Sequence, residues 1–365
     1  MTGLAGLASL LAVAVVAGGA LLLLHHRGQP AQAQAPAAGV AGPPLLTAIG
    51  AGRFAIRDQG SASVYPLGGR IYLGWEQITH DHGVRSELAR IDPVTGTVLA
   101  SVRPAPAVGP ILIDGALWSI DERPEAGGPV RARLVRSDPV TLKQLSSTRL
   151  SGSLAEGLGG LVQTGSSTWL SGRGGLDRFD STNGRLIGFV AVPDSSRASL
   201  RIWADRVGGA SALYGYMRLP YNQTQRRDPR TGALLTRART PALASDPTPS
   251  VDGRSWIHWQ YGQVGTLDLR TLAFRPAYPR IHFQTVQFNV ADGILFVDQT
   301  QGGPQRNFCA DPATGRIRAT LPLAHDAEFL AADATDIYSL LVTGVRHGPE
   351  RWFLDRTPIP AACRG

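Results

Sequence analysis

From residue 45 onward, short apolar runs alternate with polar turns, and one turn recurs every 40 to 48 residues. Its fullest form is Asp92-Pro93-Val94-Thr95-Gly96. Asp accepts hydrogen bonds from nearby backbone N–H groups, Pro fixes φ at the next position, and Gly adopts a positive φ. Each copy therefore predicts a tight turn between two strands. The leading aspartates are Asp92, Asp138, Asp180, Asp228, Asp268, Asp311 and Asp355.

A second pattern lies between these turns. A Gly-containing turn such as Asp114-Gly115 precedes a strand that holds one aromatic residue, and Asp-Gly between apolar runs is a strong hairpin signal. The strand that enters the Asp turn carries Leu and Arg two residues apart, as in Leu88 and Arg90, so both share one face. The aromatic residues are Tyr72, Trp118, Trp169, Tyr214, Trp256, Phe296 and Tyr338.

Seven units of four strands each predict an all-β, seven-bladed β-propeller over residues 45–365. Residues 1–27 form a separate membrane segment, and residues 28–44 form a linker rich in Pro, Ala and Gln. Residues 52–57 fall where the last strand of the seventh blade belongs. We therefore expect Phe54 and Ile56 to pack in that blade, because a strand from the other terminus removes the open edges of the ring.

On these motifs the chain resembles the quinoprotein-like and YVTN-type β-propeller superfamily, whose blades carry a PQQ-like repeat. The resemblance implies the fold and leaves the chemistry open. Quinone-dependent members carry a Trp that closes each repeat and often a vicinal disulfide. This chain has Val98-Leu99-Ala100 and Leu186-Ile187-Gly188 after its turns, and it has no adjacent cysteines. We therefore expect no quinone and no other cofactor.

The uncharged segment Leu4–Leu24 would rise about 31 Å as a helix, enough to cross a bilayer. We expect an uncleaved single-pass anchor; cleavage after Ala31-Gln32-Ala33 and secretion is the alternative. Arg27 follows the segment and favours a cytoplasmic propeller by the positive-inside rule. By resemblance, propellers tethered behind a flexible linker lie outside the cytoplasm, and we expect that location.

Two groups of histidines suggest chemistry. His80 and His82 flank Asp81 in the loop between the second and third strands of the first blade, where propeller ligands often bind. A metal there needs a further ligand from another blade, and no candidate stands out, so we predict no metal site. His258 lies between Trp256 and Trp259 and is expected to be a hydrogen-bonded histidine within the sheet.

The surplus positive charge is concentrated in the fourth blade. Residues 196–242 contain nine Arg and two Asp, whereas the whole chain has a net charge of +8. Arg binds phosphate and carboxylate groups through its planar fork, although arginines on an edge strand also prevent edge-to-edge pairing. The candidate binding residues of this blade are Arg218, Arg226, Arg227, Arg230, Arg237 and Arg239.

The two cysteines, Cys309 and Cys363, leave two alternatives, a pair of unrelated buried thiols or one disulfide in an oxidising compartment. No nucleophile elbow, Walker loop or dinucleotide fingerprint is present. The sequence thus favours a non-enzymatic binding or scaffold module for a protein or an anionic envelope polymer or lipid surface, rather than for nucleic acid. The alternative is a propeller lyase or hydrolase with a site at the channel mouth.

Overall fold

The computed structural model divides into two compact units, and the larger one, Gly42–Arg123 with Val130–Gly365, contains the sheets described below. The residues that the structure describes are 46–50, 53–56, 61–78, 84–103, 105–106, 108–124, 130–150, 160–172, 174–192, 200–207, 210–217, 222–241, 243, 250–251, 253–259, 263–276, 286–299, 306–323, 327–343 and 351–364.

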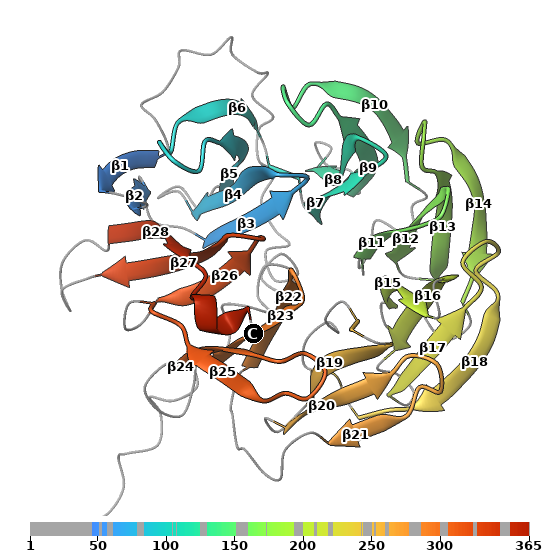
Figure 1. Cartoon of the computed structure of the whole chain (residues 1–365). Helices are drawn as coiled ribbons and strands as arrows, with labels where there is room; N and C mark the ends of the chain where they lie inside the picture. The colour runs from blue at the N-terminus through green and yellow to red at the C-terminus, as the bar shows by residue number, and fades with distance from the viewer. Residues whose placement is uncertain are drawn as a thin grey trace, which may run out of the picture. The chain divides into compact units, whose positions relative to one another are not determined.

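Seven antiparallel sheets form the larger unit, and they are arranged as the blades of a propeller (Figure 1). The first three blades contain, in chain order, β3 (Ser61–Leu67), β4 (Arg70–Ile78), β5 (Val84–Ile91) and β6 (Val98–Val102); β7 (Val108–Ile113), β8 (Ala116–Pro124), β9 (Val130–Ser137) and β10 (Gln144–Arg149); and β11 (Gly160–Thr164), β12 (Ser167–Gly172), β13 (Gly175–Asp180) and β14 (Leu186–Ala191).

The next three blades contain β15 (Arg201–Val207), β16 (Ala210–Met217), β17 (Gln223–Arg227) and β18 (Leu234–Arg239); β19 (Arg254–Trp259), β20 (Gln263–Asp268) and β21 (Phe274–Pro276); and β22 (Val286–Ala291), β23 (Ile294–Gln299), β24 (Arg306–Ala310) and β25 (Ile317–Thr320). The seventh contains β26 (Glu328–Ala332), β27 (Asp336–Thr343) and β28 (Arg351–Pro358), and the 3-10 helix η2 (Ala361–Cys363) follows it. The predicted seven-bladed fold is confirmed.

A strand from the N-terminal side completes the seventh blade. β2 (Arg53–Ile56) pairs antiparallel with β28, with Phe54 opposite Leu354 and Ile56 opposite Trp352. β1 (Leu46–Gly50) pairs with β2 and gives this blade a fifth strand, which the sequence did not predict. The predicted ring closure is therefore confirmed at the level of strand pairing. The side chains of Phe54 and Ile56 lie outside the described part of the structure.

The hydrophobic core is divided among the joints between blades, because both faces of each sheet are covered by a neighbouring blade. Each of the seven clusters of buried residues lies between two adjacent blades. The repeated aromatic residues are its largest members, and Tyr72, Trp118 and Trp169 have no exposed surface. Burying each such side chain contributes about 1.5–3 kcal/mol.

The expected membrane segment, Leu4–Leu24, lies outside the described residues, as does the linker. Within the described ranges, no helix has the length and apolar character needed to span a membrane. The assignment of residues 1–44 stays a prediction.

Candidate functional site

The first six copies of the Asp turn have the geometry that their sequence predicts, whereas Asp355, the seventh predicted copy, lies within β28 and pairs with Arg53 and Ser339. Oδ1 of Asp92 accepts hydrogen bonds from the backbone N–H groups of Val94 (2.8 Å) and Thr95 (3.1 Å). The N–H of Gly96 donates to the carbonyl oxygen of Asp92 at 2.8 Å, and Gly96 adopts φ 71°. The N–H groups of Val94 and Thr95 lower the pKa of the Asp92 carboxyl. The carboxyl of Asp92 is consequently held ionised as a structural acceptor.

The aromatic residue of one blade bonds to the turn of the next blade. The donor is a phenol O–H or an indole N–H, and the acceptor is the carbonyl oxygen of the turn's second residue. The pairs are Tyr72 with Pro139 (2.7 Å), Trp169 with Pro229 (3.1 Å), Tyr214 with Leu269 (2.9 Å) and Trp256 with Pro312 (2.7 Å). The two sequence patterns are thus partners across blade joints.

The arginine of the repeat lies directly opposite the aromatic residue on the neighbouring strand, as Arg90 opposite Tyr72 and Arg226 opposite Tyr214. Nε of Arg90 donates to the carbonyl oxygen of Val140 at 2.7 Å. Arg226 donates through one of its terminal N–H groups to the carbonyl oxygen of Arg270 at 3.2 Å. The repeat arginine therefore also joins neighbouring blades, which sequence analysis did not recognise.

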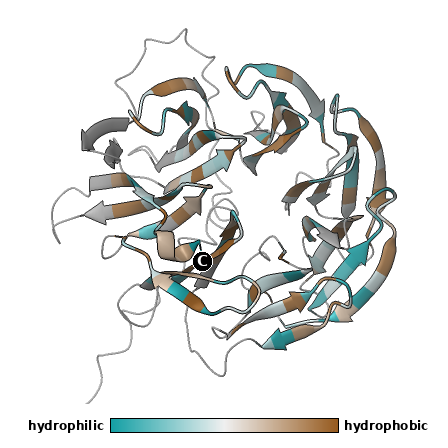
Figure 2. Ribbon diagram, in the orientation of Figure 1, coloured by the Kyte–Doolittle hydropathy of each residue, from teal (hydrophilic) through white to brown (hydrophobic). Residues whose placement is uncertain are grey.

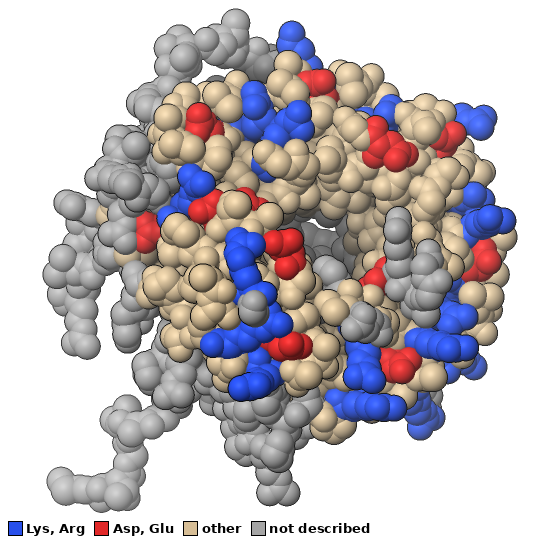
Figure 3. All heavy atoms as spheres, viewed as in Figure 1, with Lys and Arg blue, Asp and Glu red and all other residues tan. Residues whose placement is uncertain are grey.

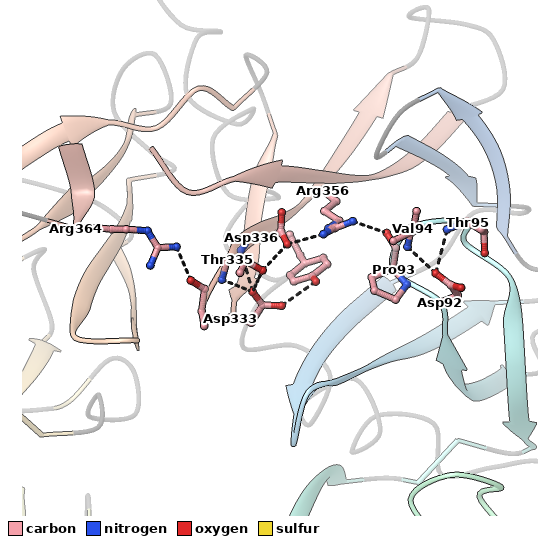
Figure 4. Close-up of polar contacts among 11 residues, drawn as sticks. Asp92, Pro93, Val94, Thr95, Asp333, Thr335, Asp336, Arg356 and Arg364 are labelled. Carbon is pink, nitrogen blue, oxygen red and sulfur yellow. Dashed lines mark hydrogen bonds and ion pairs between the residues drawn. The ribbon is translucent and has the colours of Figure 1, made fainter. Parts of the chain in front are cut away.

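At the joint between blades 7 and 1, an arginine bonds to the turn in place of the aromatic residue (Figure 4). Arg356 donates to the carbonyl oxygen of Pro93 at 3.3 Å and forms an ion pair with Asp336 at 2.8 Å. The phenol of Tyr338 instead donates to Asp333 at 3.0 Å. The hydrogen bond to Asp336 is the main reason why the pKa of Arg356 is raised.

Two of the predicted binding arginines are structural. Arg227 is buried, and it donates to Oε1 of Gln225 (2.9 and 2.6 Å) and to the carbonyl oxygen of Gly232 (2.8 Å). Burial lowers the pKa of its guanidinium. Arg226 is half-buried, with its guanidinium bonded to the next blade. Arg227 therefore contributes no cation to the surface, and this corrects the sequence prediction for that residue.

Three predicted arginines, Arg230, Arg237 and Arg239, are exposed. Blade 5 adds two more exposed arginines that the sequence analysis did not select, Arg270 in its turn and Arg275 on β21. We call these five residues the basic arc. Figure 3 shows blue side chains along the part of the rim where Figure 1 places β18 and β21.

Four members of the basic arc form no ion pair with a described carboxylate. Among the described residues, no carboxylate lies within ion-pairing distance of Arg230, Arg237, Arg270 or Arg275. Apolar side chains accompany these arginines, because Leu234 and Leu235 at the start of β18 are 44% and 54% exposed (Figure 2). The arc therefore combines unpaired guanidinium groups with apolar surface.

The remaining candidates do not assemble a catalytic site in the described part of the chain. Arg218, His80 and His82 lie outside the described residues. His258 is buried, its Nε2 has no partner among the described residues, and desolvation lowers the pKa of its imidazole. Within the described ranges, no three His, Cys, Asp or Glu side chains gather closely enough to hold a metal ion.

A buried acid that the sequence analysis did not select lies between blades 2 and 3. The side chain of Asp177 is only 1% exposed, and neither of its oxygens has a hydrogen-bond partner within the described residues. Burial raises the pKa of this carboxyl to about 6. It is opposite Leu170 on β12 and Phe189 on β14, so apolar side chains surround it.

Cys309 and Cys363 form a disulfide with a Cα–Cα distance of 5.7 Å. Of the two alternatives left open by the sequence, the structure contains the bridge. It attaches η2, at the end of the chain, to β24 of the sixth blade. Disulfides persist mainly in oxidising compartments.

Comparisons with known proteins give the fold. No protein-family model matches the chain, and no curated protein matches it. The propeller domain of the Trilobed protease from Pyrococcus furiosus is similar, with a TM-score of 0.56, 10% identity, and coverage of 82% of this chain and 98% of that one. The Neurospora crassa Pan2 WD40 domain is also similar, with a TM-score of 0.56, 12% identity, and coverage of 84% and 92%.

BamB from Moraxella catarrhalis covers 85% of this chain and 95% of its own, with 10% identity and a TM-score of 0.48. This chain is a seven-bladed β-propeller. Identities this low describe the fold alone, and a fold of this kind hosts many functions. The function must be argued from the surface of this chain.

Proposed function

We propose that this chain is a non-enzymatic binding module, tethered to a membrane by Leu4–Leu24, whose propeller lies outside the cytoplasm. The propeller binds an acidic partner, a protein or an anionic envelope polymer, through the basic arc. The observation that carries the proposal is the set of four exposed arginines without an ion pair among the described residues. Guanidinium groups bind carboxylate and phosphate through paired hydrogen bonds.

Edge protection explains only part of the arc. Arg237 and Arg275 lie on outer strands, where a charge prevents pairing with another sheet. Arg230 and Arg270 lie in turns, where there is no edge to protect. A cluster of one charge sign also accelerates the encounter with a partner of opposite charge. The Cys309–Cys363 bridge supports the proposed location, because it requires an oxidising environment to persist.

The test compares two pairs of charge reversals in the full-length protein, held in a non-ionic detergent and immobilised on a sensor surface. Arg237→Glu with Arg270→Glu alters the arc, whereas Arg149→Glu with Arg316→Glu alters exposed arginines of blades 2 and 6. Soluble poly-glutamate and poly(glycerol phosphate) are the probes.

We expect the wild-type protein and the control pair to bind the probes, with affinity that falls as salt rises. The arc pair should bind several-fold more weakly. Equal binding by both pairs, or no binding by the wild type at low salt, would exclude the arc as an anion-binding surface.

A further inference from the structure

The outer edges of the blades differ in how they are covered. In the seventh blade, β2 and β1 cover the edge of β28 by strand pairing. In the other blades the outermost strand ends its sheet among the described residues: β6, β10, β14, β18, β21 and β25. An unpaired strand edge is a template for the addition of another strand.

Most of these edges carry a charge that opposes strand addition. The outer strands β10, β18, β21 and β25 each contain at least one Arg. Only β6 and β14 contain no charged residue within their bounds. Charged side chains on an edge strand are a common means of preventing unwanted pairing. The edges of β6 and β14 lack this protection.

β14 has the more accessible apolar surface of the two. Its sequence is LIGFVA, and hydrophobic colour runs along this strand in Figure 2. Leu186, Ile187 and Phe189 are 41%, 46% and 49% exposed. A six-residue strand of apolar and β-branched residues without Pro is well suited to pair with an extended segment. β6 is one residue shorter, and the arginine that follows it, Arg103, forms an ion pair with Glu87.

Free arginines lie near both ends of β14. Arg185 immediately precedes the strand and is exposed. The turn of blade 4 that carries Arg230 packs against the other end, because a Cβ at Gly232 would lie 3.1 Å from Cγ2 of Val190. No described carboxylate forms an ion pair with Arg185 or Arg230. An uncharged edge between two unpaired cations matches a segment that is apolar in its middle and acidic at its ends.

We propose that β14 binds an extended segment of a partner protein, which adds to blade 3 as a fifth strand and places acidic residues beside Arg185 and Arg230. This inference rests on the proposed function and names the form of the partner. Within the chain, β2 adds to the edge of β28 in the same way. A second copy of the chain fits less well, because its edge brings further arginines rather than acidic residues.

The experiment measures fluorescence anisotropy of short labelled peptides with the full-length protein in non-ionic detergent. The probe alternates Val and Thr and has Glu at both ends. One control peptide has Lys at both ends, and another has Pro in place of a central Val, which removes a backbone donor. Wild-type protein should bind the Glu-ended probe about fivefold or more tightly than either control peptide.

Matched variants separate the edge from general surface effects. Leu186→Ser with Ile187→Ser should weaken probe binding several-fold, whereas Leu145→Ser on β10, at 56% exposure, should leave it unchanged. Arg185→Gln with Arg230→Gln should remove the preference for Glu ends. Arg316→Gln is its control, because Arg316 precedes β25 as Arg185 precedes β14.

Two results would overturn the inference: no binding up to millimolar probe, or equal losses in the β14 and β10 variants. Sedimentation that shows self-association of the wild type, lost in Leu186→Ser with Ile187→Ser, would assign the edge to a second copy and also overturn it. The anion-binding test with Arg237→Glu and Arg270→Glu is independent of these outcomes. If the anion-binding test succeeds and the peptide test fails, the proposed function stands and only the strand addition is rejected.

Discussion

Where the two ends of the propeller meet, the described contacts join distant parts of the chain. Within blade 7, β2 pairs with β28 and Arg356 forms an ion pair with Asp336, and between blades 7 and 1 the same guanidinium bonds to the carbonyl oxygen of Pro93. The neighbouring joint between blades 6 and 7 contains the disulfide of Cys309 and Cys363. Among the described buried polar atoms of blades 7 and 1, only Nε of Arg356 lacks a partner.

The joint between blades 2 and 3 is different, although these blades follow each other directly in sequence. Its buried polar atoms without a partner in the described structure include Nε1 of Trp118, Oγ1 of Thr168 and both carboxyl oxygens of Asp177. An unsatisfied buried polar group costs about 1–3 kcal/mol. The joint between blades 7 and 1 thus has a bond from Arg356 to the next turn, whereas the joint between blades 2 and 3 leaves several buried polar atoms without a partner in the described structure.

The largest effect is expected on the closed side of the ring. Replacing Cys309 and Cys363 with Ala should lower the free energy of unfolding by about 4 kcal/mol, because the bridge spans 54 residues and restricts the unfolded chain. Urea denaturation of the variant and of the wild type under non-reducing conditions measures the difference. Equal urea midpoints for the variant and the wild type would mean that the bridge contributes nothing to the stability of the fold.

The second largest effect is expected at Asp177, the buried acid between blades 2 and 3. At the corresponding position of blade 2, three residues before the turn Asp, the chain has Val135. Asp177→Val therefore introduces the residue type that blade 2 already carries there. Burial raises the native pKa of Asp177 to about 6, above its unfolded value of 3.8. Asp177 therefore destabilises the protein progressively as pH rises from about 4 to about 6, and the loss amounts to about 3 kcal/mol well above that pH. Asp177→Val should stabilise the protein at about pH 8 by at least that amount.

The pH dependence distinguishes this cause from improved packing alone. The gain from Asp177→Val should shrink as pH falls from about 8 to about 4, because the native carboxyl is then protonated. Asp92→Asn is a control whose effect on stability should change with pH in the opposite direction, because hydrogen bonds from the backbone lower the pKa of Asp92. A gain from Asp177→Val that is the same at both pH values would show that the pKa of Asp177 is not raised in the native state.

The repeat explains how much the sequence could predict. Turns such as Asp92–Gly96 depend on local hydrogen bonds, so the spacing of their sequence motif predicted the number of blades and a closing strand within residues 52–57. The seventh predicted turn, at Asp355, is instead part of β28. The roles of Asp177 and Arg227 did not. Alternation along a strand normally separates a buried face from an exposed one, but a blade is covered on both faces. Arg227 looked like surface charge for this reason, and Asp177 was not selected at all.

Contacts between blades also escaped prediction because they join residues far apart in sequence. Tyr72 and Pro139 were both recognised as parts of a repeat, yet nothing in either motif says that one bonds to the other. The disulfide was left open for the same reason, since 54 residues separate its cysteines. Of the basic surface, Arg230, Arg237 and Arg239 were predicted, whereas Arg270 and Arg275 joined it only because blade 5 follows blade 4 around the ring.

The smallest effect compares the two joints of blade 3 with the same substitution. Trp118 and Trp169 are fully buried, and each lies beneath an arginine, Arg136 at 5.3 Å and Arg178 at 5.8 Å from the ring centroid. Nε1 of Trp169 donates to the carbonyl oxygen of Pro229, whereas Nε1 of Trp118 has no acceptor among the described residues. Replacement by Phe removes similar volume at both positions but removes a hydrogen bond only from Trp169.

Trp169→Phe should therefore destabilise the protein by about 1 kcal/mol more than Trp118→Phe, because the second change also removes an unsatisfied donor. The difference should shrink in a background where blade 4's turn is altered by Gly232→Ala, since a Cβ there would lie 2.8 Å from the Trp169 ring. It should not vanish, because Nε1 of Trp169 also donates to Oγ1 of Thr164 at 3.0 Å. Equal losses from the two Trp substitutions in the unaltered protein would show that the indole of Trp118 finds a partner in solution. The joint between blades 2 and 3 would then be as well paired as the joint between blades 3 and 4.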